Sequence, residues 1–218
     1  MDLSGQVALV TGAGRGLGRA FAQALAAAGA RVGITARSAD ELHALVADLP
    51  EGQALALPAD VTDPTAAAEV VAAVKQRLGP LTLLVNNAGQ FRAFGAIGSV
   101  DPTEWWREVE VNLRGPFLYA HAALPLMRER RQGRIINVAS GAGLQAMPLL
   151  SAYNVGKTAL IRLSETLALE AAGDGIVVFA IHPGNVRTPM TAYVHDSPEV
   201  ARQAPHAQEW FQTLFAEG

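Results

Sequence analysis

Six short apolar runs alternate along this chain with longer segments in which apolar residues recur at helical intervals. The runs are rich in Val, Ile and Leu and lack polar alternation, which is typical of parallel strands buried on both faces. They cover residues 7–11, 31–36, 53–58, 81–85, 134–139 and 176–181. Helical spacing extends over about 39–48, 103–131 and 152–172. This alternation predicts an α/β protein with a doubly wound, Rossmann-type parallel sheet and helices on both faces. We expect a single domain over residues 1–218.

Composition and charge exclude several classes of protein. Half of the residues are hydrophobic and 17% are charged, which excludes a disordered chain. The net charge of −3 predicts no binding to nucleic acid, and the arginines within 128–134 are interpreted as a solvated helix end. There is no cysteine, and the five histidines show no short paired spacing with carboxylates, so we expect no metal.

The start of the chain and its apolar runs bear on its location. The first five residues lead directly into the first run, which leaves no room for a signal peptide. No apolar run reaches about 18 residues, so we expect no membrane span. These features predict a soluble, cytoplasmic protein.

A glycine-rich turn follows the first predicted strand. It reads Thr11-Gly12-x-x-x-Gly16-x-Gly18 and leads into a helical pattern. Glycines let the backbone turn tightly and approach a pyrophosphate, whose charge then meets the N-terminus of the helix. The strand, turn and helix in this order predict a dinucleotide site.

The ends of the second, third and fourth runs bear on which dinucleotide binds. Arg37 stands where an acidic residue would hold an adenosine ribose, and it could pair with a 2′-phosphate together with Arg15. NADP(H) is therefore the preferred coenzyme, and NAD(H) stays possible. The alternative interpretation is that both arginines are exposed loop residues that bind no phosphate. Asp60 is interpreted as an acceptor for the adenine amine or as a turn cap. The small residues of the Asn86–Gly89 stretch would let adenosine lie against the backbone.

The stretch from Ser140 to Lys157 carries the candidate chemistry. Tyr153 and Lys157 are four residues apart in a helical pattern, so both side chains leave one face of a helix. An adjacent ammonium favours the phenolate, and bringing a tyrosine pKa from ~10 to roughly 7 takes about 4 kcal/mol. Ser140 directly follows the fifth run, at the sheet edge where ligands bind. The alternative is that this common spacing has no catalytic meaning. Asn112 has two interpretations. It is a core residue whose amide is fully hydrogen-bonded, or it disturbs its helix and holds a water.

Taken together, these motifs resemble those of the short-chain dehydrogenase/reductase family, over residues 5 to about 190. The resemblance rests on the glycine turn, Asp60, the Asn86–Gly89 stretch, Asn112, Ser140, Tyr153-x-x-x-Lys157, and Pro183-Gly184 with Thr188. It implies an oxidoreductase that interconverts a ketone and a secondary alcohol.

The resemblance also implies a role for each group. Tyr153 would be the general acid/base, and Lys157 would lower the pKa of Tyr153 and bind the nicotinamide ribose. Ser140 would orient the substrate oxygen, and Asn112 would hold a water that relays protons. Thr188 and the backbone around Val186 would fix the carboxamide. The implied coenzyme-binding residues are Gly12, Arg15, Gly16, Leu17, Gly18, Arg37, Asp60, Val61, Asn87, Ala88, Gly89, Tyr153, Lys157, Pro183, Gly184, Val186 and Thr188.

The end of the chain departs from the family pattern. The family adds a helix and a seventh strand after about residue 190, and we find no candidate for that strand before Gly218. Either the sequence is incomplete or the protein ends early. The resemblance predicts a homodimer or homotetramer through residues 103–131 and 152–172, with the tetramer in doubt.

The expected substrate pocket is formed by 90–98, 141–150 and 185–215. Its apolar residues favour an apolar or mixed ketone or secondary alcohol, although several could instead fill core or subunit contacts. They are Phe91, Phe94, Leu144, Met147, Leu149, Leu150, Met190 and Tyr193. The alternative functions are a non-catalytic nucleotide-binding protein on the same fold and a sugar-nucleotide epimerase or dehydratase.

Overall fold

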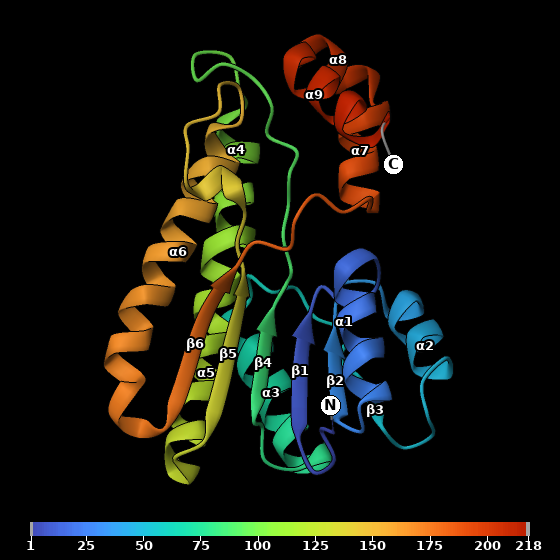
Figure 1. The fold of residues 1–218 in the computed structure, drawn as a ribbon, viewed down its shortest axis with the longest axis vertical. Coiled ribbons are helices and arrows are strands. Elements are labelled where there is room, and N and C mark those ends of the chain that lie inside the picture. Colours follow the sequence, from blue (N-terminus) through green and yellow to red (C-terminus); the bar gives the residue numbers. More distant parts are fainter. Residues whose placement is uncertain (1, 217–218) are drawn as a thin grey trace.

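The computed structural model describes residues 2–216 and contains one parallel six-stranded sheet (Figure 1). The predicted strands are all present, with β1 and β6 at their predicted bounds and the others within two residues of theirs at each end. They are β1 (Val7–Thr11), β2 (Arg31–Thr35), β3 (Ala54–Ala56), β4 (Leu83–Asn86), β5 (Gly133–Val138) and β6 (Ile176–Ile181). The strand order is β3-β2-β1-β4-β5-β6, which confirms the doubly wound Rossmann-type fold.

The order of the strands locates the crevice where a ligand binds. β1 lies between β2 and β4, with Ala8 paired to Val32 on one side and to Leu83 on the other. The chain therefore reverses its winding direction between β1 and β4. Open α/β sheets bind ligands at such a switch point, outside the carboxyl ends of the strands.

Helices connect the strands, and their starts follow the sequence signals. Asp63 caps α3 by accepting hydrogen bonds from the amides of Thr65 and Ala66, and proline follows it at the first helical position. These helices are α1 (Gly16–Ala27), α2 (Ala39–Ala47), α3 (Pro64–Leu78), α4 (Pro102–Val109), α5 (Gly115–Arg130) and α6 (Ser151–Ala171). Three more follow the sheet: α7 (Pro189–Asp196), α8 (Pro198–Gln203) and α9 (Pro205–Ala216).

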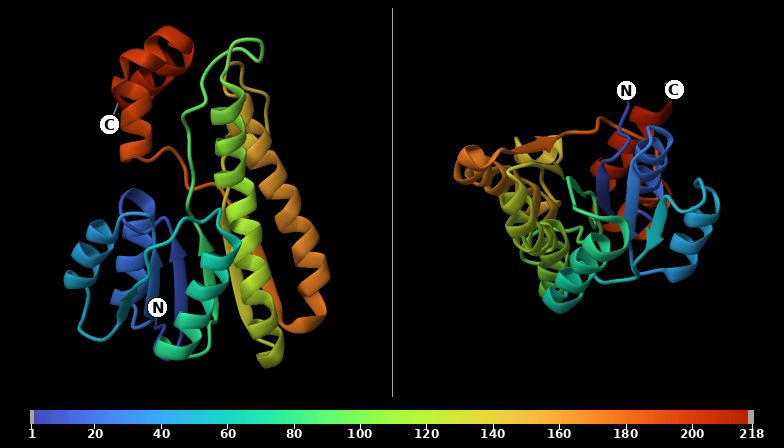
Figure 2. Two further views of the ribbon diagram at one scale, coloured as in Figure 1. Left: turned by 180° about the vertical axis from the view of Figure 1, so that it is seen from behind. Right: turned by 90° about the horizontal axis from the view of Figure 1, so that it is seen from below.

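The two faces of the sheet are covered unequally. Helices α3, α5 and α6 pack on one face along its length, whereas α1 and α2 lie on the other face over β1, β2 and β3 (Figures 1 and 2). Among residues 2–216 nothing covers the outward face of β6, where Val177 and Phe179 are each 48% exposed. The prediction of helices on both faces is confirmed, and on the second face they cover the half formed by β1, β2 and β3.

The predicted helix 103–131 is interrupted. A π-helical segment, Glu110–Arg114, separates α4 from α5 and contains Asn112. Such a segment frees backbone groups from the regular hydrogen-bond pattern and often occurs at functional sites. Asn112 therefore lies at a disturbance of the helical ladder, which is part of one of the two interpretations made from the sequence.

The last three helices form a separate lobe above the carboxyl ends of the strands (Figure 1). They lie within the segment expected to be substrate-side, and no seventh strand occurs in the described part of the chain. The last two residues of the chain, Glu217 and Gly218, lie outside the described residues. No helix among those described is both long enough and apolar enough to span a bilayer.

Candidate active site

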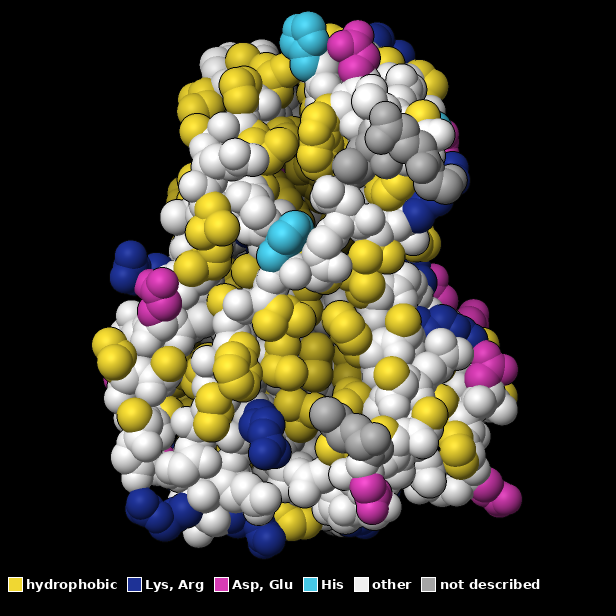
Figure 3. Space-filling view, in the orientation of Figure 1, with side chains coloured by type: hydrophobic (Ala, Val, Ile, Leu, Met, Phe, Trp, Pro, Cys, Tyr) yellow, Lys and Arg dark blue, Asp and Glu magenta, His cyan; other side chains and the backbone are white. Residues whose placement is uncertain are grey.

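A cavity of about 990 Å³ opens at the carboxyl ends of the strands and joins the glycine turn to α6. In the space-filling view, hydrophobic side chains line a hollow between the terminal lobe and the rest of the molecule (Figure 3). Most of the predicted site residues line the cavity. They are Gly12, Arg15, Gly16, Leu17, Arg37, Asp60, Val61, Asn87, Ala88, Gly89, Ser140, Tyr153, Lys157, Pro183, Gly184, Val186 and Thr188.

Close backbone packing explains two of the glycines. Gly12 has φ of +64°, and a Cβ there would lie 2.8 Å from Cα of Ala88. Gly18 does not line the cavity, so its predicted contact with a coenzyme is not supported. A Cβ on Gly18 would lie 2.2 Å from the carbonyl oxygen of Gly12, because the start of α1 packs directly beneath the turn. Gly18 therefore supports the turn.

The turn is also tied to the end of β4. The Asn87 side chain donates to the carbonyl oxygens of Thr11 and Gly12, at 2.9 and 3.2 Å. In the other direction, the Thr11 hydroxyl accepts from the amides of Asn87 and Ala88, both at 3.0 Å. These bonds fix the two strand ends that flank the switch point, leaving a cradle in which backbone and small side chains face the cavity.

This cradle fits a dinucleotide coenzyme. The N-terminus of α1 opens onto the glycine turn, where a pyrophosphate would meet free amides and a favourable helix dipole. Arg15 and Arg37 are exposed on the same wall, and neither forms an ion pair among residues 2–216. No group of three or more His, Asp or Glu side chains suited to hold a metal occurs in the described part of the chain.

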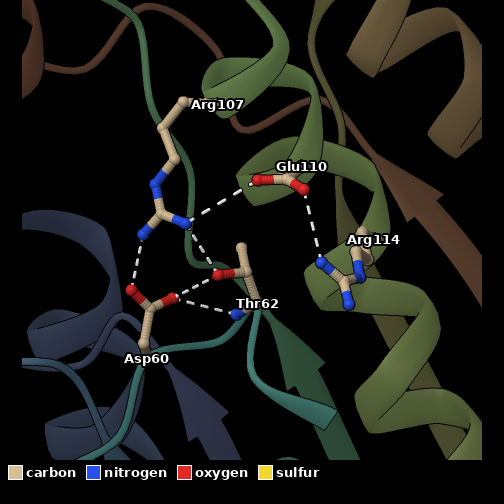
Figure 4. A network of polar contacts seen from close by, with 5 residues as sticks. All are labelled: Asp60, Thr62, Arg107, Glu110 and Arg114. Atoms are coloured by element: carbon tan, nitrogen blue, oxygen red, sulfur yellow. Dashed lines mark hydrogen bonds and ion pairs between the residues drawn. The ribbon is translucent and has the colours of Figure 1, made fainter. Parts of the chain in front are cut away.

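Asp60 belongs to a polar network that joins the end of β3 to α4 (Figure 4). One carboxylate oxygen accepts from the amide and hydroxyl of Thr62, at 2.9 and 2.8 Å, and the other pairs with Arg107 at 2.5 Å. Burial alone would raise the pKa of Asp60, but these contacts outweigh it and hold the pKa below its usual value. Both interpretations made from the sequence therefore remain open: the carboxylate caps a turn, and it also lines the cavity.

Arg107 was not identified from the sequence. It also donates to the Thr62 hydroxyl at 2.8 Å and lies 3.8 Å from Glu110, which in turn pairs with Arg114 at 3.3 Å (Figure 4). The result is a link between the adenosine side of the cavity and the π-helical segment.

Tyr153 and Lys157 lie on one face of α6, as predicted, with the Lys157 nitrogen 5.6 Å from the centre of the tyrosine ring. The lysine is 4% exposed, and its ammonium donates to the carbonyl oxygen of Val138 at 2.8 Å. Burial lowers the pKa of Lys157 to about 8, although the nearby Glu108 carboxylate raises it.

The expected lowering of the tyrosine pKa is not found in this structure. The pKa of Tyr153 is raised to about 12, and burial of the phenol is the largest cause. Ser140 acts in the opposite direction by hydrogen bonding, whereas the charge of Glu108 adds to the rise. The sequence argument weighed the ammonium but not the loss of water around the phenol. With Lys157 bonded to the Val138 carbonyl, burial is the larger effect.

Asn112 is fully buried and does not line the cavity. Its side chain accepts from the amide of Gln90 at 3.2 Å and donates to the carbonyl oxygen of Gln90 at 2.7 Å. It is thus a satisfied core residue that fixes the start of the loop after β4, one of the two interpretations made from the sequence. It lies against Gly89, whose neighbours also include the Lys157 nitrogen.

Glu108 holds the same loop one turn earlier on α4, and the sequence analysis missed it. One carboxylate oxygen accepts from the amides of Arg92 and Ala93, while the other is buried and has no hydrogen-bond partner among residues 2–216. Burial raises the pKa of Glu108. Its four-residue spacing from Asn112 was a signal, because side chains at that spacing share a helix face.

The substrate half of the cavity is lined by part of the predicted apolar set. Its lining includes Phe91, Met147, Leu150, Met190 and Tyr193. Phe94 and Leu149 pack behind this wall, and Leu144 is 77% exposed to solvent, so these three assignments are wrong. The lining residues that were not singled out from the sequence include Gln90, Arg92, Gln145, His182, Trp210 and Phe211.

Comparisons with known proteins agree with this geometry. Residues 6–199 match the family model for short chain dehydrogenases. The short chain dehydrogenase pigC of Monascus ruber is 39% identical over 86% of this chain, which spans 64% of that protein. D-beta-hydroxybutyrate dehydrogenase of Rhizobium meliloti is 40% identical over 85% of this chain and 73% of the relative.

A solved structure shows the same fold. The 3-ketoacyl-(acyl-carrier-protein) reductase of Brucella melitensis, crystallised with NADH, superposes with a TM-score of 0.82 at 34% identity, covering 87% of this chain and 79% of the other. The fold, the cavity and these relatives lead to one conclusion: the chain belongs to the short-chain dehydrogenases, a family of NAD(P)-dependent oxidoreductases.

Proposed function

We propose that this protein interconverts a ketone and a secondary alcohol, with NADP(H) as the preferred coenzyme and Tyr153 as the general acid/base. The observation that carries the proposal is a continuous cavity that reaches from the glycine turn to Tyr153, Lys157 and Ser140. The substrate half of that cavity is mostly apolar, which suits a small-molecule ketone or alcohol. We also propose that residues 1–218 form one domain, with α7–α9 on the substrate side.

Each catalytic group has a task that follows from its place. A Tyr153 with a pKa of about 12 carries its proton at neutral pH and is ready to donate it to a carbonyl oxygen. Ser140, which lines the same cavity, would orient the same oxygen. In the oxidative direction the buried ammonium of Lys157 would stabilise the phenolate. Asn112 would act through the loop that it holds and through the π-helical backbone beside it.

The coenzyme, when bound, supplies the hydride chemistry. Residues of this chain that line the cavity would hold it. The glycine turn faces the pyrophosphate position, and Pro183, Gly184, Val186 and Thr188 lie at the end near Ser140. The Thr188 hydroxyl also caps α7 by accepting from the amide of Thr191 at 3.2 Å, which joins this wall to the terminal lobe.

The role of Tyr153 is tested by Tyr153→Phe, which removes one oxygen and keeps the ring. We expect turnover of ketones with NADPH to fall by about 10²–10⁴-fold, the usual contribution of a positioned acid. Tyr119→Phe is the matched control, because Tyr119 is buried away from the cavity. Turnover surviving within about tenfold in Tyr153→Phe would remove the tyrosine from this role.

The coenzyme preference rests on Arg37 and Arg15, two exposed guanidinium groups beside the adenosine end of the cavity. Charge-assisted hydrogen bonds are worth about 1.5–3 kcal/mol, so Arg37→Ala should weaken NADPH binding by about 10–100-fold and leave NADH binding within about threefold. Arg202→Ala, on α8, is the control. Equal binding of both coenzymes to the wild type, unchanged by Arg37→Ala, would refute the assignment.

We further propose that the protein forms a homodimer or homotetramer through α4, α5 and α6. Large apolar side chains are exposed on these helices: Trp106 by 62%, Phe117 by 48% and Leu169 by 82%. Light scattering on the purified protein should give twice or four times the chain mass. A mass of one chain at micromolar concentration would exclude this proposal.

A further inference from the structure

The apolar wall of the substrate half begins beside the proposed acid. The ring of Phe91 lies 4.3 Å from the ring of Tyr153, centre to centre, and 6.1 Å from that of Phe211 in α9. Met147, Leu150 and Met190 continue this wall. A substrate whose reacting oxygen meets Tyr153 therefore extends along hydrocarbon surface toward the terminal lobe.

Arg92 places a positive charge in the same cavity. It directly follows Phe91, and its guanidinium carbon lies 4.3 Å above the centre of the Tyr193 ring. The Tyr193 hydroxyl donates to a Glu199 carboxylate oxygen at 3.1 Å, which fixes the ring from its far end. The backbone amide of Arg92 is held by the buried carboxylate of Glu108. Glu108 thus fixes the backbone that carries the exposed Arg92 side chain, and the Tyr193 ring positions the guanidinium itself.

Arg92 forms no ion pair among residues 2–216, and Glu199 lies at the far end of the Tyr193 ring on which the guanidinium rests. The acidic side chains that line the cavity are Glu41, Asp60 and Glu104, and within residues 2–216 none of them forms an ion pair with Arg92. By contrast, Arg107, another arginine that lines the cavity, is paired with Asp60. A guanidinium whose face rests on an aromatic ring still presents its N–H groups at its edge, and that edge matches a carboxylate bidentately.

We propose that Arg92 binds a carboxylate of the substrate, so that the substrates are oxo acids and the corresponding hydroxy acids with an apolar spacer between the two groups. This inference rests on the proposed function. In reduction, the carbonyl carbon gains a hydride from the reduced nicotinamide coenzyme and the carbonyl oxygen gains the Tyr153 proton. The coenzyme is oxidised by two electrons, the C=O double bond becomes a C–O single bond, and the carboxylate on Arg92 is unchanged.

The test compares acids with their neutral esters. Reduction of 3-, 4- and 5-oxohexanoate and of their methyl esters is measured with NADPH and NADH for wild type, Arg92→Gln and Arg92→Lys. Arg202→Gln, an exposed arginine on α8, controls for the loss of one positive charge. For at least one skeleton, wild-type kcat/KM should be about 10–100-fold higher for the acid than for the ester.

Arg92→Gln should lower kcat/KM for that acid by about 10–100-fold and change the value for its ester by less than about threefold. Arg92→Lys should recover only part of the loss, because lysine lacks the bidentate fork. Calorimetry gives a second readout: the hydroxy acid should bind the wild-type enzyme, saturated with coenzyme, at least about tenfold more tightly than it binds Arg92→Gln.

Four outcomes would overturn the inference. Equal use of acid and ester by the wild type would do so while leaving the proposed function intact. An equal loss for acid and ester in Arg92→Gln would mean that the Arg92–Tyr193 contact only joins the loop to α7. If other neutral ketones are reduced but none of these acids or esters is, with either coenzyme, the proposed carboxylate site at Arg92 is wrong and the proposed function stands. If no ketone is reduced at all, both the carboxylate site and the proposed function fail.

Discussion

Replacing Lys157 by methionine should stabilise the coenzyme-free protein at neutral pH and at the same time remove its activity. Burial lowers the pKa of this lysine from 10.5 to about 8, an effect only partly opposed by Glu108. At pH 7 the folded protein therefore carries an ammonium that water solvates better in the unfolded chain. Methionine is an unbranched side chain without charge, so it removes this cost and adapts to the space.

The size of the effect follows from the pKa. The difference between 10.5 and about 8 corresponds to about 3 kcal/mol, at about 1.36 kcal/mol per pKa unit. Losing the 2.8 Å bond from the lysine leaves the buried Val138 carbonyl oxygen without this partner, which costs about 1–2 kcal/mol. We therefore expect Lys157→Met to raise the free energy of unfolding at pH 7 by about 1–2 kcal/mol.

The pH dependence separates this cause from a general packing effect. Between pH 8 and 10.5 the unfolded chain binds a proton on the lysine that the folded protein has released, so wild-type stability rises with pH in this window. Below about pH 8 both states are protonated and the full cost persists. Tyr153, with its pKa raised from 10.0 to about 12, adds an opposite slope above pH 10. The range from pH 8 to 10 therefore reports on Lys157.

Urea unfolding of coenzyme-free protein, in steps from pH 7 to 10, measures both quantities. Lys157→Met should lose the rise with pH, whereas Lys75→Met should keep it, because Lys75 is a half-exposed lysine paired with Glu129 on the surface. NADPH-dependent turnover is followed on the same samples. A variant that is less stable than the wild type at pH 7 and keeps the wild-type pH slope would refute the reasoning.

Two further predictions concern the packing that holds the site. Gly18→Ala places a methyl group 2.2 Å from the carbonyl oxygen of Gly12, so it should lower the free energy of unfolding by about 1–3 kcal/mol and weaken coenzyme binding. Gly173→Ala, whose methyl group meets no atom within 4 Å, is the control for thermal melts and coenzyme titration. Glu108→Gln keeps an acceptor for the two amides of residues 92–93 and should be at least as stable as the wild type at pH 7, since it removes a buried charge. In urea unfolding, the free energy of unfolding of Glu108→Leu should be about 2 kcal/mol lower than that of Glu108→Gln. Equal values for the two variants would show that the hydrogen bonds from the amides of residues 92 and 93 to residue 108 contribute nothing to stability.

Patterns of neighbouring residues were enough to predict the architecture of this protein. An uninterrupted apolar run identifies a buried strand, and the alternation of strands with helical segments leaves few topologies other than a doubly wound sheet. The glycine turn and the spacing of Tyr153 and Lys157 are likewise local, because each depends on the geometry of one turn or one helix. This is why their placement in one cavity could be anticipated.

The contacts that adjust the site depend on the tertiary structure. Arg107 reaches Asp60 across 47 positions, and Arg92 meets Tyr193 from a loop on the opposite side of the cavity. No local periodicity links such pairs, since the path of the intervening chain decides which side chains meet. Burial is likewise a property of the whole fold. The spacing of Tyr153 and Lys157 predicts their proximity, but the loss of water around both groups determines their pKa values, because desolvation disfavours the charged forms of phenol and amine alike.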